Sequence, residues 1–263
     1  MLLLRLIAAS GFRRDSWILV SMLLINAAVL FFWHHHNGGM AWRIRLLFYP
    51  LAMNLLYPVL KTAIPAIHPK LEDGVLQAAD RVLIGANLSV RLEPLVHPAI
   101  TEFLSFCYML YFVYLLLGQL WYLIGGLELL KKYYVGLFCL YAIGYFGYSV
   151  LPALGPYLAM AGQFHTPLTG GWFTAANSQL VLNGSNRVDV FPSLHCANSL
   201  YILIFDYSHK RWRFWLYLVP CIGFWISTIY LRYHYFVDLI CGFLLGLLAW
   251  QIAQLGVTEE SQT

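Results

Sequence analysis

Charged residues are scarce in this chain of 263 residues, of which 11% are Asp, Glu, Lys or Arg. Average soluble domains carry about 25% of these residues. So few charges cannot cover the surface of a soluble globule of this length, whereas helices that face lipid need none. The composition therefore excludes an ordinary soluble domain. The sequence also resembles no nucleic-acid-binding module, so we expect no nucleic acid as a partner.

Cysteine is scarce as well, and its few positions show no paired close spacing. The five residues are Cys107, Cys139, Cys196, Cys221 and Cys241. This pattern favours small buried side chains over a disulfide framework or a zinc cluster. The three histidines at 34–36 predict an interfacial polar cap rather than a metal site, because adjacent residues on a helix do not share a face. We expect neither a metal nor a cofactor.

Long apolar segments are abundant, and 60% of the residues are hydrophobic. A transmembrane helix needs about 20 mostly apolar residues. Candidate spans cover residues 17–33, 44–66, 99–126, 133–152, 192–208, 214–232 and 234–254. The predicted fold is therefore an all-α, polytopic integral membrane helical bundle with six or seven transmembrane helices. Residues 1–12 are apolar but short, which is typical of an interfacial helix or a signal-like start.

Basic residues in the short loops predict the orientation of the spans. Three clusters share one side if the spans alternate: Arg43 and Arg45; Lys131 and Lys132; and Lys210, Arg211 and Arg213. That side is expected to be cytoplasmic, because cytoplasmic loops are enriched in Lys and Arg. Seven spans would put Arg5, Arg13 and Arg14 on the opposite side. Either the first span crosses incompletely, the second is re-entrant, or the rule is broken here.

This topology brings polar residues from distant segments to one depth on the non-cytoplasmic side. His195 starts the fifth span, and His234 and Asp238 start the seventh. Positions i and i+4 share a helix face, so Asp238 can accept a hydrogen bond from one ring nitrogen of His234. A carboxylate there stabilises the cation that forms when the imidazole attacks an electrophile. His195 can protonate a departing oxygen.

Nearby arginines and a helix start favour an anion at the same place. The beginning of a helix is positively polarised, and guanidinium groups hold phosphate oxygens in a fork. A nucleophilic imidazole, its carboxylate, a general acid and these clamps together predict phosphoryl transfer through a phosphohistidine.

Two motifs carry a resemblance to a known family. FPSLH at 191–195 and HYFVD at 234–238 resemble the second and third signature motifs of the type 2 phosphatidic acid phosphatase superfamily. SVLPALGPY at 149–157 and DRVLIG, which begins at Asp80, are similar to its inositolphosphotransferase branch, which includes fungal inositol phosphorylceramide synthase. The resemblance covers roughly residues 75–250. It implies that His234 is the nucleophile, Asp238 its partner, and His195 the acid that later acts as a base.

The sequence departs from the superfamily in its phosphate-binding residues. No Lys followed by Arg-Pro precedes LPALGPY, and the arginine of the third motif would fall at Thr228. Phosphate binding must then come from other groups. The candidates are Arg232 and Arg187, assisted by Ser193 and by backbone amides.

The predicted function is a membrane lipid phosphatase or phosphotransferase with its site on the periplasmic, extracellular or lumenal face of a cell inner membrane or endomembrane. Its partners are the bilayer and a lipid phosphate. Water as the acceptor makes it a phosphatase, and an alcohol such as inositol or ceramide makes it a transferase. The alternative is a non-enzymatic transporter or flippase of anionic lipids. Vanadate-dependent haloperoxidases share related motifs, but those enzymes are soluble.

Three regions follow from these assignments. Residues 1–74 are predicted to hold the N-terminal membrane segments with one or two spans. Residues 75–254 form the phosphatase or phosphotransferase membrane domain, and residues 255–263 form a disordered tail. Two long connections stand out within this plan: 67–98 is typical of a helical segment on the membrane surface, and 153–191 is rich in Gly, Pro, Asn, Ser and Thr. Long connections of this kind are usually functional or disordered.

Overall fold

The structure is a computed structural model that describes residues 1–33, 36 and 38–255. In this part of the chain all the regular structure is helical, with two short 3-10 turns, η1 (Glu93–Leu95) and η2 (Ala161–Gln163). The α-helices are α1 (Leu2–Ser10), α2 (Arg14–Trp33), α3 (Gly39–Ile67), α4 (Asp73–Ile84), α5 (Leu88–Arg91), α6 (Pro98–Ile124), α7 (Leu127–Val150), α8 (Pro156–Ala159), α9 (Trp172–Gly184), α10 (Leu194–His209), α11 (Arg211–Tyr230) and α12 (Phe236–Leu255).

Five of the described helices are long and apolar enough to cross a membrane, namely α2, α3, α6, α7 and α12. The predicted all-α polytopic membrane bundle is therefore confirmed. Helix α10, with 16 residues, and α11, which carries Arg211 and Arg213, complete the bundle beside them. The prediction that these two also span the membrane, for a total of six or seven, stays a prediction. Residues His34 and His35 of the histidine run and the tail from 256 onward lie outside the described residues.

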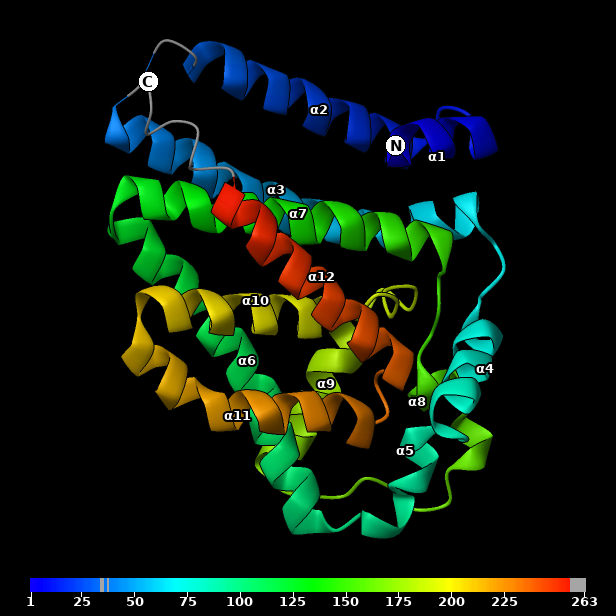
Figure 1. The fold of residues 1–263 in the computed structure, drawn as a ribbon. Helices are drawn as coiled ribbons and strands as arrows, with labels where there is room; N and C mark the ends of the chain where they lie inside the picture. The colour runs from blue at the N-terminus through cyan, green and yellow to red at the C-terminus, as the bar shows by residue number, and fades with distance from the viewer. Residues whose placement is uncertain (34–35, 37, 256–263) are drawn as a thin grey trace.

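Helix α10 forms the centre of the bundle, packed against α12, α11, α7 and α6 (Figure 1). The largest apolar core lies between α3, α6, α7, α10, α11 and α12. Two glycines of α12 allow its backbone to approach α10 closely. A Cβ atom at Gly242 would lie 2.5 Å from the carbonyl oxygen of Ser193, and one at Gly246 would lie 2.7 Å from that of Ala197. These glycines keep the starts of the two helices together, where the candidate histidines lie.

Replacement of Gly246 with alanine is expected to lower the stability of the protein. The added methyl group meets a backbone carbonyl that cannot rotate away, and overpacking of this kind costs about 1–3 kcal/mol. The measurement is the midpoint of thermal unfolding in detergent micelles. Gly74→Ala is the matched control, because a Cβ atom at Gly74 would meet nothing within 4 Å. Unfolding of the Gly246 variant at the wild-type temperature would contradict the packing described here.

The three basic clusters lie at one end of the bundle. Arg43 donates to the carbonyl oxygen of Gly125, between α6 and α7. Arg45 and Lys131 each lie 4.6 Å from the ring centre of Trp42. Lys210 lies 5.5 Å from the ring centre of Trp121, at the end of α6. These contacts place the three clusters at one end of the bundle, and the side of the membrane that this end faces stays a prediction.

The boundary predicted for the fourth span is wrong at its start. Helix α7 begins at Leu127 rather than at 133, so Lys131 and Lys132 lie in its first two turns and not in a loop. Lys131 pairs with Glu128 in the first turn at 3.0 Å, which is the i, i+3 spacing that supports a helix. The connection between α6 and α7 is consequently very short.

The N-terminal helices form a separate layer along α3. Helices α1 and α2 pack on α3. Figure 1 shows them at the edge of the bundle, with α3 between them and α7. Arg5 donates a hydrogen bond of 2.6 Å to Ser149, near the last residue of α7. Arg5 thus lies at the end of the bundle opposite the basic clusters. An arrangement of seven spans would thus leave Arg5 on the side opposite the basic clusters, against the rule that basic residues gather on one side.

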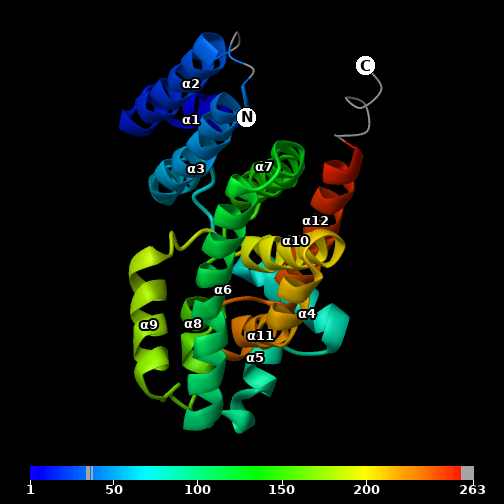
Figure 2. The same cartoon turned by 90° about the vertical axis from the view of Figure 1, so that its left-hand side faces the viewer.

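The two long connections fold into helices at the end of the bundle away from the basic clusters. As expected, 67–98 is largely helical, with α4 packed against α12. The connection 153–191 is more ordered than its composition predicts, because α9 packs along α6 (Figure 2). Glu102 of α6 explains this order. Its carboxylate accepts hydrogen bonds from the backbone amides of Gly171, Phe173 and Thr174 and so caps the start of α9.

Candidate active site

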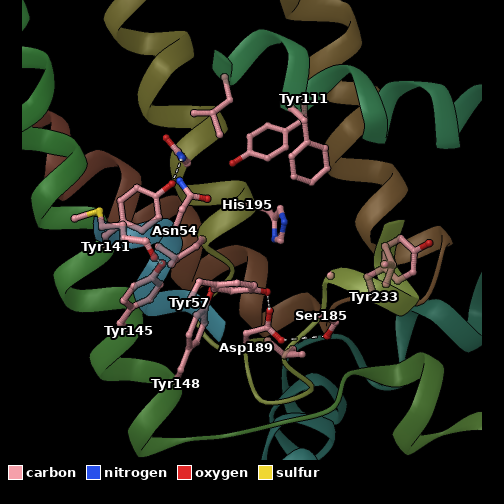
Figure 3. A pocket seen from close by; sticks show the side chains of 18 of the residues that line it. Asn54, Tyr57, Tyr111, Tyr141, Tyr145, Tyr148, Ser185, Asp189, His195 and Tyr233 are labelled. Atoms are coloured by element: carbon pink, nitrogen blue, oxygen red, sulfur yellow. Dashed lines mark hydrogen bonds between the residues drawn. The ribbon is translucent and has the colours of Figure 1, made fainter. Parts of the chain in front are cut away.

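A cavity of about 390 Å³ opens among α3, α6, α7, α9 and the start of α10. His195 and His234 both line it, and Figure 3 shows the His195 ring facing the open space. Tyrosine dominates the described lining, with Tyr57, Tyr108, Tyr111, Tyr134, Tyr141, Tyr145, Tyr148, Tyr157 and Tyr233. The other polar residues of the lining are Asn54, Gln119, Ser185, Asp189 and Asn198. The site is thus rich in hydroxyl groups and aromatic rings.

The structure brings the two candidate histidines together. The ring centres of His195 and His234 lie 5.8 Å apart, although 39 positions separate them in the sequence. His195 lies in the first turn of α10, and rings of α6 surround it, with those of Tyr108 and Tyr111 at 5.9 and 5.6 Å. Its Nδ1 is buried and has no hydrogen-bond partner among the described residues. The His195 ring lines the cavity, where it can meet a group that enters.

His234 lies in the turn between α11 and α12, not on α12 as the predicted span implied. Helix α12 begins at Phe236, two residues later. Nδ1 of His234 lies 3.5 Å from Oδ2 of Asp238, close enough for an ion pair but longer than a normal hydrogen bond. The expected hydrogen bond on one helix face is therefore not formed, because His234 precedes the helix. Oδ2 instead accepts from the backbone amide of Tyr235, at 2.9 Å.

Burial keeps the imidazole of His234 neutral. The residue is 4% exposed, and loss of solvation lowers its pKa to about 4. The neutral form is the one with a free nitrogen lone pair, as a nucleophile requires. With Nδ1 on the side of Asp238, the second nitrogen, Nε2, lies 3.4 Å from Oγ of Ser193.

Ser193 links the two halves of the site. Its Oγ accepts a hydrogen bond from the amide of Cys196 and so caps α10, while its own amide donates to the carbonyl oxygen of Asp238. The start of α10 is therefore tied to the start of α12. A phosphate contact for Ser193 stays a prediction.

The two candidate arginines lie away from the described lining of this cavity. Arg232 is buried beside a smaller cavity, 4.0 Å from the ring centre of Phe164, and donates to the carbonyl oxygen of Thr166 at 2.6 Å. It lies 3.8 Å from Oε1 of Glu93. Arg187 is exposed. Phosphate binding by these arginines stays a prediction, and the described lining of the main cavity contains no Lys or Arg.

The contact between Arg232 and Glu93 affects the pKa of both residues. Burial lowers the pKa of Arg232, and the carboxylate of Glu93 acts against that shift. The pKa of Glu93 is lowered chiefly because the backbone amide of Thr166 donates to it, with smaller effects from the amide of His165 and from Arg232. The guanidinium is therefore engaged in holding the 164–166 segment.

Thr228, at the position of the superfamily arginine, has a structural role. Its side chain is fully buried and donates to the carbonyl oxygen of Trp225. Its own carbonyl oxygen accepts from the amides of Tyr233 and His234, both at 3.0 Å. These bonds close the turn that presents His234, in which Arg232 has a φ of 68°. Position 228 thus shapes the turn and supplies no cation.

Sequence reasoning missed two buried carboxylates of α4 that hold this turn. Asp80 accepts from the amides of Phe236 and Val237 and caps α12 from outside the helix. Asp73 accepts from the amides of Leu154 and Gly155. Burial raises the pKa of Asp80, and the two amides oppose that rise. A signal existed, because two acidic residues seven positions apart share one face of an amphipathic helix.

Asp189 was also missed, and it is the acidic residue of the described cavity lining. Tyr57 of α3 donates to its Oδ2, and Ser185 donates to its Oδ1 at 3.3 Å, as Figure 3 shows. Asn186 donates to the carbonyl oxygen of Tyr57, at 2.7 Å. These bonds attach the segment before FPSLH to α3. No local pattern marks Asp189, since its partners lie more than a hundred residues away or in an irregular loop.

Among the comparisons with known proteins, one family model matches the chain. No curated protein and no solved structure matches the chain significantly. A family model described as the PAP2 superfamily matches residues 73–252, from the first residue of α4 to within α12. That superfamily supports phosphatase-type activity on lipid-like phosphates. With a match over more than half of its length, and with its two motif histidines at one cavity, the chain belongs to the PAP2 superfamily.

Proposed function

We propose that the protein is a membrane lipid phosphatase or phosphotransferase that works through a phosphohistidine at His234. The observation that carries this proposal is the meeting of His195 and His234, 5.8 Å apart, at one cavity of a membrane bundle. A phosphorus atom placed between the two rings would meet a nucleophile on one side and a proton donor on the other.

The first step transfers the phosphoryl group to the protein. Nε2 of His234 forms a bond to phosphorus while the bond from phosphorus to the ester oxygen breaks. His195 donates its proton to that oxygen, and the lipid alcohol leaves. Asp238, behind Nδ1, stabilises the positive charge that develops on the imidazole ring.

The second step releases the group. His195, now neutral, takes a proton from water or from an alcohol, whose oxygen bonds to phosphorus as the bond to Nε2 breaks. Water yields a phosphatase, and an alcohol such as inositol or ceramide yields a transferase. The resemblance of SVLPALGPY to the inositolphosphotransferase branch favours transfer.

We place the reaction at the non-cytoplasmic face of a cell inner membrane or endomembrane. The cavity histidines lie at the end of the bundle opposite Arg43, Lys131 and Lys210, and basic residues favour the cytoplasmic side. The alternative, a carrier of anionic lipids, finds less support, because the described cavity lining offers such a lipid no Lys or Arg.

The test uses the purified full chain with a panel of lipids: phosphatidic acid, ceramide phosphate, and phosphatidylcholine, -ethanolamine, -glycerol and -inositol. Each carries radiolabelled phosphorus, and the reaction is quenched in base, which preserves phosphohistidine. We expect release of diacylglycerol or ceramide from at least one lipid, with label on the protein at early times. Addition of inositol, glycerol or ceramide then identifies the acceptor. No lipid alcohol from any member of the panel would overturn the proposal.

A further inference from the structure

The cavity has a charge balance that does not suit a phosphate monoester. Apart from the two histidines, Asp189 is the one Asp, Glu, Lys or Arg in the described lining of the cavity, and its carboxylate brings a negative charge. Sites for phosphate monoesters use Arg or Lys to neutralise two negative charges. The carboxylate of Asp189 would repel the two negative charges of a phosphate monoester if no cation lay between them. The substrate group that enters here is therefore expected to bring a positive charge of its own.

Asp189 is a buried carboxylate that has no Lys or Arg partner among the described residues. It is 9% exposed and forms no ion pair within 4.0 Å among the described residues. Its observed partners are the neutral hydroxyl groups of Tyr57 and Ser185. Buried charges are normally paired, because burial without a partner is costly. Two hydroxyl donors leave room on the carboxylate for a cation that approaches from the cavity.

Aromatic rings gather on the same side of the cavity as this carboxylate. Figure 3 shows Tyr57, Tyr145 and Tyr148 beside Asp189, with the Tyr57 hydroxyl directed at it. The rings of Tyr145 and Tyr148 lie 5.9 Å apart on successive positions of one face of α7. Ring faces attract cations, and cages of aromatic side chains are a known solution for binding alkylammonium groups. Carboxylate and rings together suit an ammonium ion.

We propose that Asp189 and the adjoining tyrosines bind the ammonium group of a zwitterionic phospholipid headgroup, of the choline or ethanolamine class. This assignment rests on the proposed function and names its substrate. The donor is then a phosphodiester with one negative charge, which its own ammonium balances. His234 bonds to phosphorus, the bond to the glycerol oxygen breaks, and His195 protonates that oxygen. Diacylglycerol leaves, and the phospho-amino-alcohol stays on His234 until water or an alcohol takes it.

The test compares release of diacylglycerol from phosphatidylcholine, phosphatidylethanolamine, phosphatidylglycerol, phosphatidylinositol and phosphatidic acid. We expect the wild-type protein to prefer the first two by about tenfold or more, in keeping with a desolvated cation over aromatic rings. Asp189→Asn keeps an acceptor for Tyr57 and removes the charge. It is expected to slow the two zwitterionic lipids by about 10- to 100-fold and to spare phosphatidylglycerol. Glu128→Gln, at an exposed position, is the matched control for loss of one carboxylate.

A second pair of variants keeps the proposal testable if Asp189→Asn does not fold. Tyr148→Phe retains the ring, whereas Tyr148→Leu removes it, so only the leucine variant is expected to lose the preference for zwitterionic lipids. Preference of the wild-type protein for phosphatidylinositol or phosphatidic acid would overturn the assignment and leave the proposed function standing. Labelled choline that enters a lipid product from solution, with no preference among donors, would place the ammonium on the acceptor and also overturn it. Absence of diacylglycerol from every lipid would instead count against the proposed function.

Discussion

Replacement of His234 with alanine is expected to lower release of the lipid alcohol by more than about 1,000-fold, because removal of a covalent nucleophile eliminates the pathway through the intermediate. The base-quenched variant should also carry no phosphorus label. Both readouts are needed, since loss of activity by itself also follows from misfolding. A cooperative thermal unfolding transition of the variant in detergent would show that it folds, which is a necessary check because His234 is buried.

His209→Ala provides the matched control for a histidine change. His209 ends α10 at the opposite end from His195 and stacks on Phe205, with ring centres 4.4 Å apart. Its loss should leave the label on the protein unchanged. A His234 variant that still forms a base-stable, acid-labile phosphoprotein at the wild-type rate would show that another residue is the nucleophile.

Replacement of His195 with alanine is expected to slow release of the natural lipid alcohol by about 100- to 10,000-fold, the usual contribution of a positioned acid. The loss should depend on the leaving group. In a lipid-like nitrophenyl phosphate ester, the leaving group is nitrophenolate, a stable anion that needs no proton. Formation of the phosphoprotein from this ester should therefore be nearly normal. The second step, which uses His195 as a base, should stay slow, and the label should accumulate on His234.

That accumulation separates a chemical role from a structural one. The His195 ring packs among Tyr108, Tyr111 and Phe112, so its loss also opens space in the cavity. A purely structural role would slow both esters equally and leave no trapped intermediate. His195→Gln, which fills much of the same space, should show the same dependence on the leaving group as the alanine variant.

Much of the site could be predicted from short stretches of sequence because its chemistry is concentrated in them. The sparse charge and long apolar runs determine a membrane helical bundle, since lipid-facing helices need no charged surface. Alternation of spans then brings FPSLH and HYFVD to one end, and the histidines do meet there. The separation of His234 from Asp238 could not be predicted, because it depends on where α12 begins, and the amide contacts of Asp80 influence that start.

The sequence by itself determined the class of fold, the grouping of the basic clusters at one end of the bundle and the pair of histidines, because periodicity, charge and motif spacing act over short distances. Only the tertiary structure decided which charges reach the cavity. It pairs Arg232 with Glu93 beside a second cavity and brings Asp189, hydrogen-bonded to Tyr57, into the first. The physical reason is that a buried charge takes whatever partner the folded chain brings within a few ångströms. That partner can lie more than a hundred residues away, where no local pattern records it.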